Sequence, residues 1–179
     1  MSAPLSQLYN LARLGNAGDA IRVEADESQC AAIAALAGAL SLPRFVAQVD
    51  LKKTSPSRFL LSYRLEADVV QACVVTLEPV AAKIDHAFTR ELHFTATGRP
   101  LPEVADLDLS GHDLSLEEGE EPEEIDNMHY DLAGPVLEEF LLALDPYPRC
   151  PGVEFDPGAE AVLRPESPFA VLKSLKPSK

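Results

Sequence analysis

Two cysteines occupy positions at which paired cysteines would form a metal-binding hook. Three residues after Cys73 stands Thr76, where a C-x-x-C hook would place its second sulfur. Cys150 ends the Pro-rich run 146–150, and no cysteine follows it. A structural zinc site needs about four ligands, usually supplied as two such hooks. The chain therefore has the outline of a metal clip without enough ligands to fill it.

Neither metal binding nor thiol catalysis is predicted for these cysteines. His86 or His129 would have to complete a metal site, and His86 falls on an apolar strand face, where a packed histidine is the simpler interpretation. A catalytic thiol needs a neighbouring histidine or cation to lower its pKa, and only Arg149 adjoins Cys150. The chain has no G-x-S-x-G, Gly-rich phosphate loop or HExxH motif. We predict no enzyme activity, no cofactor and no metal, with Cys73 and Cys150 as weak metal candidates only.

The charge of the chain is polarised. The net charge is −14, which weighs against nonspecific RNA binding, because Lys and Arg that neutralise phosphates supply most of that affinity. Residues 113–126 carry eight acids and no Lys or Arg, so the rest of the chain carries a net charge of −6. Residues 43–65 carry a local net charge of +4 from five basic residues and Asp50.

These two charged regions give the candidate binding residues. The basic region predicts an RNA-binding surface, with a solvated outer strand face as the alternative, because its aromatic residues Phe45, Phe59 and Tyr63 fall on the apolar parity. The acidic tract predicts a site for a basic protein partner, with solubility as an equally good explanation. The RNA-binding candidates are Arg44, Lys52, Lys53, Arg58 and Arg64, and the protein-partner candidates are Glu117, Glu118, Glu120, Glu121, Glu123 and Glu124.

The first 95 residues predict one helix and several strands. Residues 20–25 read as a strand, and Asp26 with Gln29 forms a capping box for a helix to about residue 40, with a buried stripe of Cys30, Ile33, Leu36 and Leu40. Alternating residues predict a hairpin of strands 44–52 and 59–65 around a five-residue loop, 53–57. Further strands are expected at 69–77 and at 83–95, where Arg90 falls on the apolar face and suggests a bulge.

The second half predicts a loop between helices. Residues 98–127 combine prolines, glycines and the acidic tract, so a flexible surface loop is expected there, with at most a short strand near 103–109. A helix capped by Asp131 is expected over 131–144, and a short helix opened by Ser167 and Pro168 is expected at the C-terminus. The apolar face of the 131–144 helix would contain Leu132, Val136, Leu137, Phe140, Leu141 and Leu144.

These elements predict an α+β fold. The expected architecture is a mainly antiparallel twisted sheet, or a partly closed β-barrel, with a helix in the N-terminal half, a helix near 131–144 and a short C-terminal helix. We expect a single domain over 1–179 that includes the flexible acidic loop. The chain shows no signal peptide and no stretch that would span a bilayer. Three widely spaced cysteines argue against a disulfide framework, so a reducing cytoplasm is the expected location.

Three segments together resemble the YceD family, the large ribosomal RNA subunit accumulation proteins. Segment 71–80, QACVVTLEPV, resembles the family's motif C-x-R-C-hydrophobic-x-P, with Thr76 in place of the second cysteine. Segment 125–151 is similar in its acidic and apolar helix followed by a Pro-rich turn that ends at Cys150. Segment 167–176, SPFAVLKSLK, resembles the family's N-P-F-A-x-L-x-x-L-K tail.

The resemblance implies a role in ribosome biogenesis. It implies a non-enzymatic factor that supports accumulation of 23S ribosomal RNA, with precursor ribosomal RNA or a basic large-subunit ribosomal protein as its partner. It carries no catalytic residues. The alternative that the residues leave open is a metal- or thiol-dependent RNA-processing enzyme.

Overall fold

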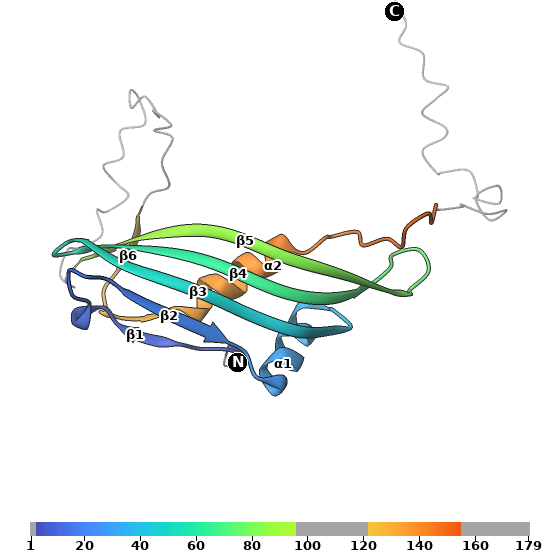
Figure 1. The fold of residues 1–179 in the computed structure, drawn as a ribbon, viewed down its shortest axis with the longest axis horizontal. Coiled ribbons are helices and arrows are strands. Elements are labelled where there is room, and N and C mark those ends of the chain that lie inside the picture. Colours follow the sequence, from blue (N-terminus) through green and yellow to red (C-terminus); the bar gives the residue numbers. More distant parts are fainter. Residues whose placement is uncertain (1–2, 96–121, 155–179) are drawn as a thin grey trace, which may run out of the picture.

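The structure, a computed structural model, describes residues 3–95 and 122–154 and is built around one open, twisted sheet (Figure 1). Its five strands lie in the order β2–β3–β4–β5–β6, with antiparallel pairing except for the parallel pair β5–β6. The predicted α+β class with a mainly antiparallel sheet is thereby confirmed, and in the described residues the sheet is not closed into a barrel. The strand bounds are β2 Asp19–Glu24, β3 Ser41–Ser55, β4 Arg58–Ala72, β5 Pro79–Phe94 and β6 Glu123–Ile125.

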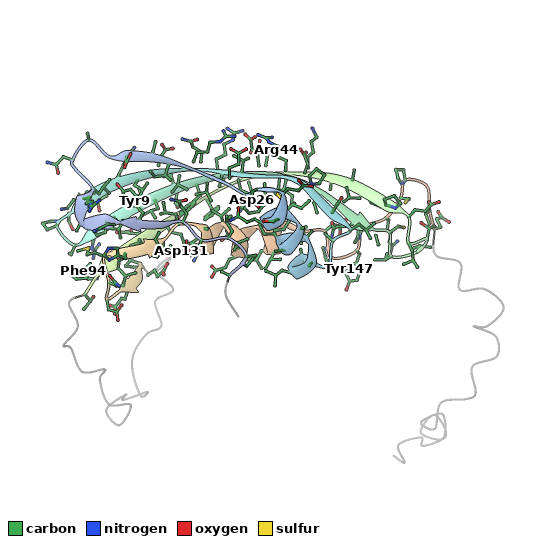
Figure 2. The ribbon with its side chains drawn as sticks, turned by 90° about the horizontal axis from the view of Figure 1, so that it is seen from below. Tyr9, Asp26, Arg44, Phe94, Asp131 and Tyr147 are labelled. Atoms are coloured by element: carbon green, nitrogen blue, oxygen red, sulfur yellow. The ribbon has the colours of Figure 1, made fainter. Side chains whose placement is uncertain are left out.

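Both helices cover the same face of this sheet (Figures 1 and 2). Helix α1 spans Glu27–Ala37 and α2 spans Ala133–Ala143. Beside them, β1 (Leu8–Asn10) pairs antiparallel with β7 (His129–Asp131), and the short helix η1 (Leu11–Arg13) follows β1. No helix in the described ranges is long and apolar enough to cross a membrane.

Alternation along the long strands sends one set of side chains into the core between the sheet and the helices. Phe45 of β3 and Phe140 of α2 meet edge to face with ring centroids 5.3 Å apart, and both rings are buried. Phe59 and Tyr63 are buried as well, as their parity predicts. These aromatic rings are therefore part of the core and are not exposed for stacking on bases.

Helix α1 begins as predicted and ends earlier. Asp26 and Gln29 form the capping box in both directions, and Gly38, at φ 64°, ends the helix in the left-handed conformation that glycine adopts readily. Cys30 and Ile33 are buried as expected. The prediction for Leu36 and Leu40 was wrong: each is 57% exposed, because the sheet covers the face of the helix that contains Ala34 instead.

The strands are longer and more regular than predicted. Only two residues separate β3 from β4, so the prediction of a five-residue loop over 53–57 was wrong. The two strands remain paired up to Ser55 and Arg58, with one register shift between residues 53 and 55. The predicted strands 59–65 and 69–77 are parts of one strand, β4, which ends at Ala72. Strand β5 pairs with β4 without a register shift, so the bulge suggested at Arg90 is absent.

The predictions for the second half hold in part. Asp131 Oδ1 accepts from the backbone N–H of Ala133 at 3.0 Å, although the residue directly before α2 is Leu132. Leu141 was wrongly placed in the core and is 38% exposed. The loop expected over 98–127 was wrong at β6, because Glu123–Ile125 pairs with β5. Residues 96–121, with the strand suggested near 103–109, and the C-terminal helix lie outside the described residues.

Candidate functional site

A tight turn, residues 73–78, connects the ends of β4 and β5. The backbone N–H of Cys73 donates to the carbonyl of Glu78 at 2.8 Å, and the N–H of Leu77 donates to the carbonyl of Cys73 at 2.9 Å. Leu77 adopts a φ of 63°, which is unfavourable for a residue with a side chain. The turn reverses the direction of the chain over residues 73–78, and the Cys73 sulfur faces the backbone N–H of Thr76 in the same turn.

The segment after α2 docks on this turn. The N–H of Val74 donates to the carbonyl of Pro148 at 2.9 Å, and the side-chain amide of Gln71 donates to the carbonyl of Asp145 at 3.0 Å. These bonds place Cys150 against Cys73, whose Sγ accepts the backbone N–H of Cys150 at 3.4 Å. The sequence left open whether the two cysteines meet, and the structure brings them together.

Thr76 and Glu78 complete a small polar cluster around the two sulfurs. The hydroxyl of Thr76 lies 3.8 Å from Cys150 Sγ and 3.4 Å from Glu78 Oε2, and Cys150 Sγ lies 3.8 Å from the same Glu78 oxygen. The N–H of Thr76 donates to Cys73 Sγ at 3.5 Å. We name Cys73, Thr76, Glu78 and Cys150 the thiol cluster.

The contacts in the thiol cluster shift the pKa values of Cys73 and Cys150 in opposite directions. The hydroxyl of Thr76 and the backbone N–H groups of Cys150 and Thr76 stabilise the thiolate of Cys73 and lower its pKa from 9.0 to about 6. Cys73 has no exposed surface, and desolvation opposes this shift only weakly. The Thr76 hydroxyl also favours a thiolate at Cys150, but burial and the negative charges of Cys73 and Glu78 outweigh it and raise the pKa of Cys150.

The other residues considered for metal or catalytic roles lie elsewhere. His86 Nε2 lies 3.4 Å from Glu139 Oε2 on α2, and His129 contacts Asn127. Arg149 is exposed and forms no recorded ion pair within the described residues. Across residues 3–95 and 122–154, no group of three His, Cys, Asp or Glu side chains is arranged to hold a metal.

Figure 2 shows Arg44 on the sheet face opposite the helices, and the strand register places Lys52, Arg58 and Arg64 on the same face. Lys53 is opposite the buried Phe59 and therefore lies on the helix-side face of the sheet, near the end of β3. Three of the five face carboxylates: Arg44 lies 2.7 Å from Glu66, Arg64 lies 2.9 Å from Asp85, and Arg58 lies 3.6 Å from Glu91. In the described part of the chain, Lys52 and Lys53 have no carboxylate within 4.0 Å. The basic side chains without a neighbouring carboxylate are therefore Lys52 and Lys53, which are both exposed beside the β3–β4 turn but point to opposite faces of the sheet.

The acidic candidates divide between two parts of the chain. Glu117, Glu118, Glu120 and Glu121 lie outside the described residues. Glu123 and Glu124 are both exposed on β6, and Glu123 accepts a hydrogen bond from the hydroxyl of Tyr130 at 2.8 Å. Glu123 therefore helps to attach β6 to β7, and of the described protein-partner candidates Glu124 is the one with no recorded side-chain hydrogen bond or ion pair.

Sequence reasoning missed an ion-pair group between β5 and α2. Arg90 Nη2 lies 3.2 Å from Glu139 and 3.3 Å from Glu138. Glu139 is 20% exposed, so this pair is partly shielded from solvent. The signal was available in the sequence, because Arg90 falls on the inward parity of its strand, where an arginine needs an acidic partner.

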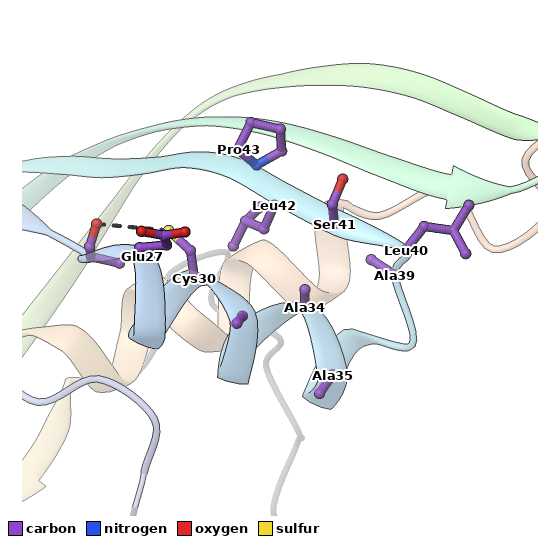
Figure 3. Close-up of a pocket in the computed structure, with 11 residues that line it drawn as sticks. Glu27, Cys30, Ala34, Ala35, Ala39, Leu40, Ser41, Leu42 and Pro43 are labelled. Atoms are coloured by element: carbon purple, nitrogen blue, oxygen red, sulfur yellow. Dashed lines mark hydrogen bonds between the residues drawn. The ribbon is translucent and has the colours of Figure 1, made fainter.

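A shallow groove runs between α1 and the start of β3 (Figure 3). Cys30, Ala34, Leu40 and Pro43 line it, with Glu27 as its charged residue. The thiol of Cys30 donates to the carbonyl of Ala25 at 3.7 Å, and burial followed by the charge of Asp26 raises its pKa. The groove therefore holds a protonated thiol and mostly small apolar side chains, and it offers no acid–base pair.

These observations define an α+β protein with an open sheet. Its β4–β5 turn, which contains Cys73, packs against the Pro-rich segment that follows α2. The model of the family described as "Large ribosomal RNA subunit accumulation protein YceD" matches residues 61–176, which is more than half of the chain. The chain belongs to the YceD family. This membership supports a role in ribosome biogenesis. Neither the curated proteins nor the solved structures gave a match.

Proposed function

We propose that this protein is a non-enzymatic, cytoplasmic ribosome biogenesis factor that supports accumulation of 23S ribosomal RNA. It does so by binding precursor ribosomal RNA, a basic large-subunit ribosomal protein, or both. The observation that carries the proposal is the family match over residues 61–176, which includes the thiol cluster, α2 and most of the sheet.

The contact with RNA is assigned to Arg44, Lys52, Lys53, Arg58 and Arg64. Lys52 and Lys53 contribute most, because Arg44, Arg58 and Arg64 each have a carboxylate neighbour that competes with phosphate. Each Lys or Arg that neutralises a phosphate releases a counterion and makes binding more salt-dependent. The contact with a basic protein is assigned to Glu117, Glu118, Glu120, Glu121, Glu123 and Glu124.

Crosslinking in cells followed by purification and identification of both RNA and protein tests the proposal. Recovery of precursor large-subunit RNA or a large-subunit ribosomal protein supports it, and recovery of neither contradicts it. For RNA, Lys52→Glu and Lys53→Glu should weaken binding and flatten its salt dependence. Lys83→Glu on β5 is the matched control, since its side chain is 89% exposed and lies near Asp68. Equal losses in all three variants would contradict the assignment to Lys52 and Lys53.

The alternative function is a thiol-dependent RNA-processing enzyme, favoured by the low pKa of Cys73. In the described residues, the two sulfurs contact backbone N–H groups and the Thr76 hydroxyl, and the Cys150 thiol donates to the Glu78 carboxylate. These contacts include no histidine or lysine that could act as a base. Replacing Cys73 and Cys150 by Ser separates the two functions. If ribosomal RNA accumulation collapses while the folded structure persists, the binding-factor proposal is wrong.

A further inference from the structure

The thiol cluster contains two free cysteines that the fold holds together from distant parts of the chain. Cys73 and Cys150 are 77 residues apart in sequence. Backbone bonds position both residues: Cys73 through Glu78, and Cys150 through the N–H that donates to Cys73 Sγ. The hydroxyl of Thr76 lies 3.8 Å from Cys150 Sγ and its N–H donates to Cys73 Sγ at 3.5 Å, so one residue contacts both sulfurs.

We infer that Cys73 and Cys150 form a reversible intramolecular disulfide by exchange with a low-molecular-weight disulfide. The N–H of Cys150 lies 3.4 Å from Cys73 Sγ, and an N–Cα bond is about 1.5 Å long, so the Cα of Cys150 lies within about 5 Å of that sulfur. A disulfide needs the two Cα atoms about 4.4–6.8 Å apart, and this contact of the Cys150 backbone with the Cys73 sulfur holds the two residues close to that range. Bond formation therefore needs side-chain rotation and little movement of the backbone.

The different exposures of the two thiols set the order of the exchange. Cys150 is partly exposed, whereas Cys73 has no exposed surface, so an external disulfide reaches Cys150 first. The Cys150 thiolate attacks one sulfur of R–S–S–R, forms the mixed disulfide Cys150–S–S–R and releases R–S⁻. The Cys73 thiolate then attacks the Cys150 sulfur, forms the Cys73–Cys150 bond and releases the second R–S⁻.

The exchange balances in atoms and electrons. Two cysteine thiols lose two protons and two electrons, and the small disulfide is reduced to two thiols. The hydrogen bonds from Thr76 and from the N–H of Cys150 stabilise the Cys73 thiolate that performs the second attack. The low pKa of Cys73 supports this role, because a thiolate is the nucleophile in exchange.

The third cysteine is a matched control. Cys30 is 7% exposed on α1, donates to a backbone carbonyl, and has a raised pKa. It is not among the contacts of the thiol cluster in the described residues. The disulfide should therefore form in Cys30→Ser as readily as in the unchanged chain.

The test equilibrates the full-length protein with mixtures of reduced and oxidised glutathione and measures intact mass and thiol-linked peptides. A loss of about 2 Da, a linked Cys73–Cys150 peptide and an increase in Tm are expected, all reversed by dithiothreitol. Cys73→Ser should stop at the Cys150–glutathione adduct, and Cys150→Ser should resist modification. The proposal is overturned if the unchanged protein accumulates a glutathione adduct without the linked peptide, or links through Cys30 or between molecules. Because this result is read on the unchanged protein, loss of folding in a variant does not affect it.

Discussion

The backbone N–H of Cys150 donates to the Sγ of Cys73 at 3.4 Å, although Cys73 precedes α2 in the sequence and Cys150 follows it. This contact joins the β4–β5 turn to the residues that follow α2. It is a structural connection within the segment that the family model matches. Its strength depends on the charge of the sulfur, because a thiolate is a better acceptor than a thiol.

That dependence predicts a pH effect on stability. The pKa of Cys73 is about 6 in the folded protein and near 9.0 when unfolded, so between these values the unfolded chain binds a proton that the folded protein lacks. The stabilisation is fully present above pH 9, and it is lost as pH falls through 6. Denaturant unfolding should show that the difference in unfolding free energy between the unchanged protein and Cys73→Ala grows from pH 6 to 9. Cys30→Ala should show no such growth, because the pKa of Cys30 lies above 9.0. A constant difference for Cys73→Ala would contradict the ionised state.

Thr76 occupies the position of a missing sulfur, and Thr76→Cys should create a metal site. Its Oγ1 lies 3.8 Å from Cys150 Sγ, and its N–H contacts Cys73 Sγ, so a sulfur there would join two others beside Glu78. Three thiolates and a carboxylate match the ligand types and number of a tetrahedral Zn²⁺ site. Thr76→Cys should bind one equivalent of zinc, and Co²⁺ should give a thiolate charge-transfer band. Thr89→Cys, on the outer face of β5, is the control, and equal metal uptake by both variants would contradict the prediction.

Leu77 has a left-handed backbone conformation with an exposed side chain, at φ 63° and 76% exposure. Leu77→Ile should lower the unfolding free energy by roughly 1 kcal/mol, because a β-branched residue fits this conformation poorly. Val74→Ile is the control in the same turn, since Val74 is exposed and has no positive φ. Chemical denaturation measures both. If Leu77→Ile is as stable as the control, the turn adapts without strain.

Arg90 should contribute more to stability than an arginine on the outer face. Arg90→Met leaves Glu138 and the partly shielded Glu139 without their arginine partner and should cost about 1–3 kcal/mol. Arg22→Met removes an exposed pair with Glu24, in which both side chains are more than half exposed, and should cost less than Arg90→Met because solvent screens exposed ion pairs. Thermal and denaturant unfolding measure the two losses. Equal losses would mean that Glu139 is solvated as well as Glu24.

Local sequence signals correctly predicted the start of α1 and the strands that bury one face and expose the other. The capping box at Asp26 and Gln29 and the alternation around Phe45 and Tyr63 are local signals, and the structure confirms each of them. Leu36 was wrongly predicted to be buried because the larger side chains of α1 were expected to face the core. The sheet instead packs against the face of α1 that contains the small residue Ala34. Small residues allow a helix to pack close to a sheet, and their hydrophobic signal is weaker.

Long-range relationships could not be predicted in the same way. Nothing local to Cys73 or Cys150 indicates that they meet, because their contact depends on how α2 returns across the sheet. The pairing of β6 with β5 also depends on tertiary context, since residues 123–125 have the composition of a loop. Arg90 gave a local signal, but its partner Glu139 could be identified only once α2 had been placed against β5.

The pairing of β1 with β7 has a consequence for how the protein folds. Strands β3, β4 and β5 are joined by short turns, so their contacts form between neighbours in sequence and close small loops. The bond from the N–H of Gln7 to Asp131 instead links residues 124 apart, and closing that loop costs more chain entropy. We expect the three-stranded meander to form early and the N-terminal segment to join last, so amide exchange should be faster in β1 than in β4.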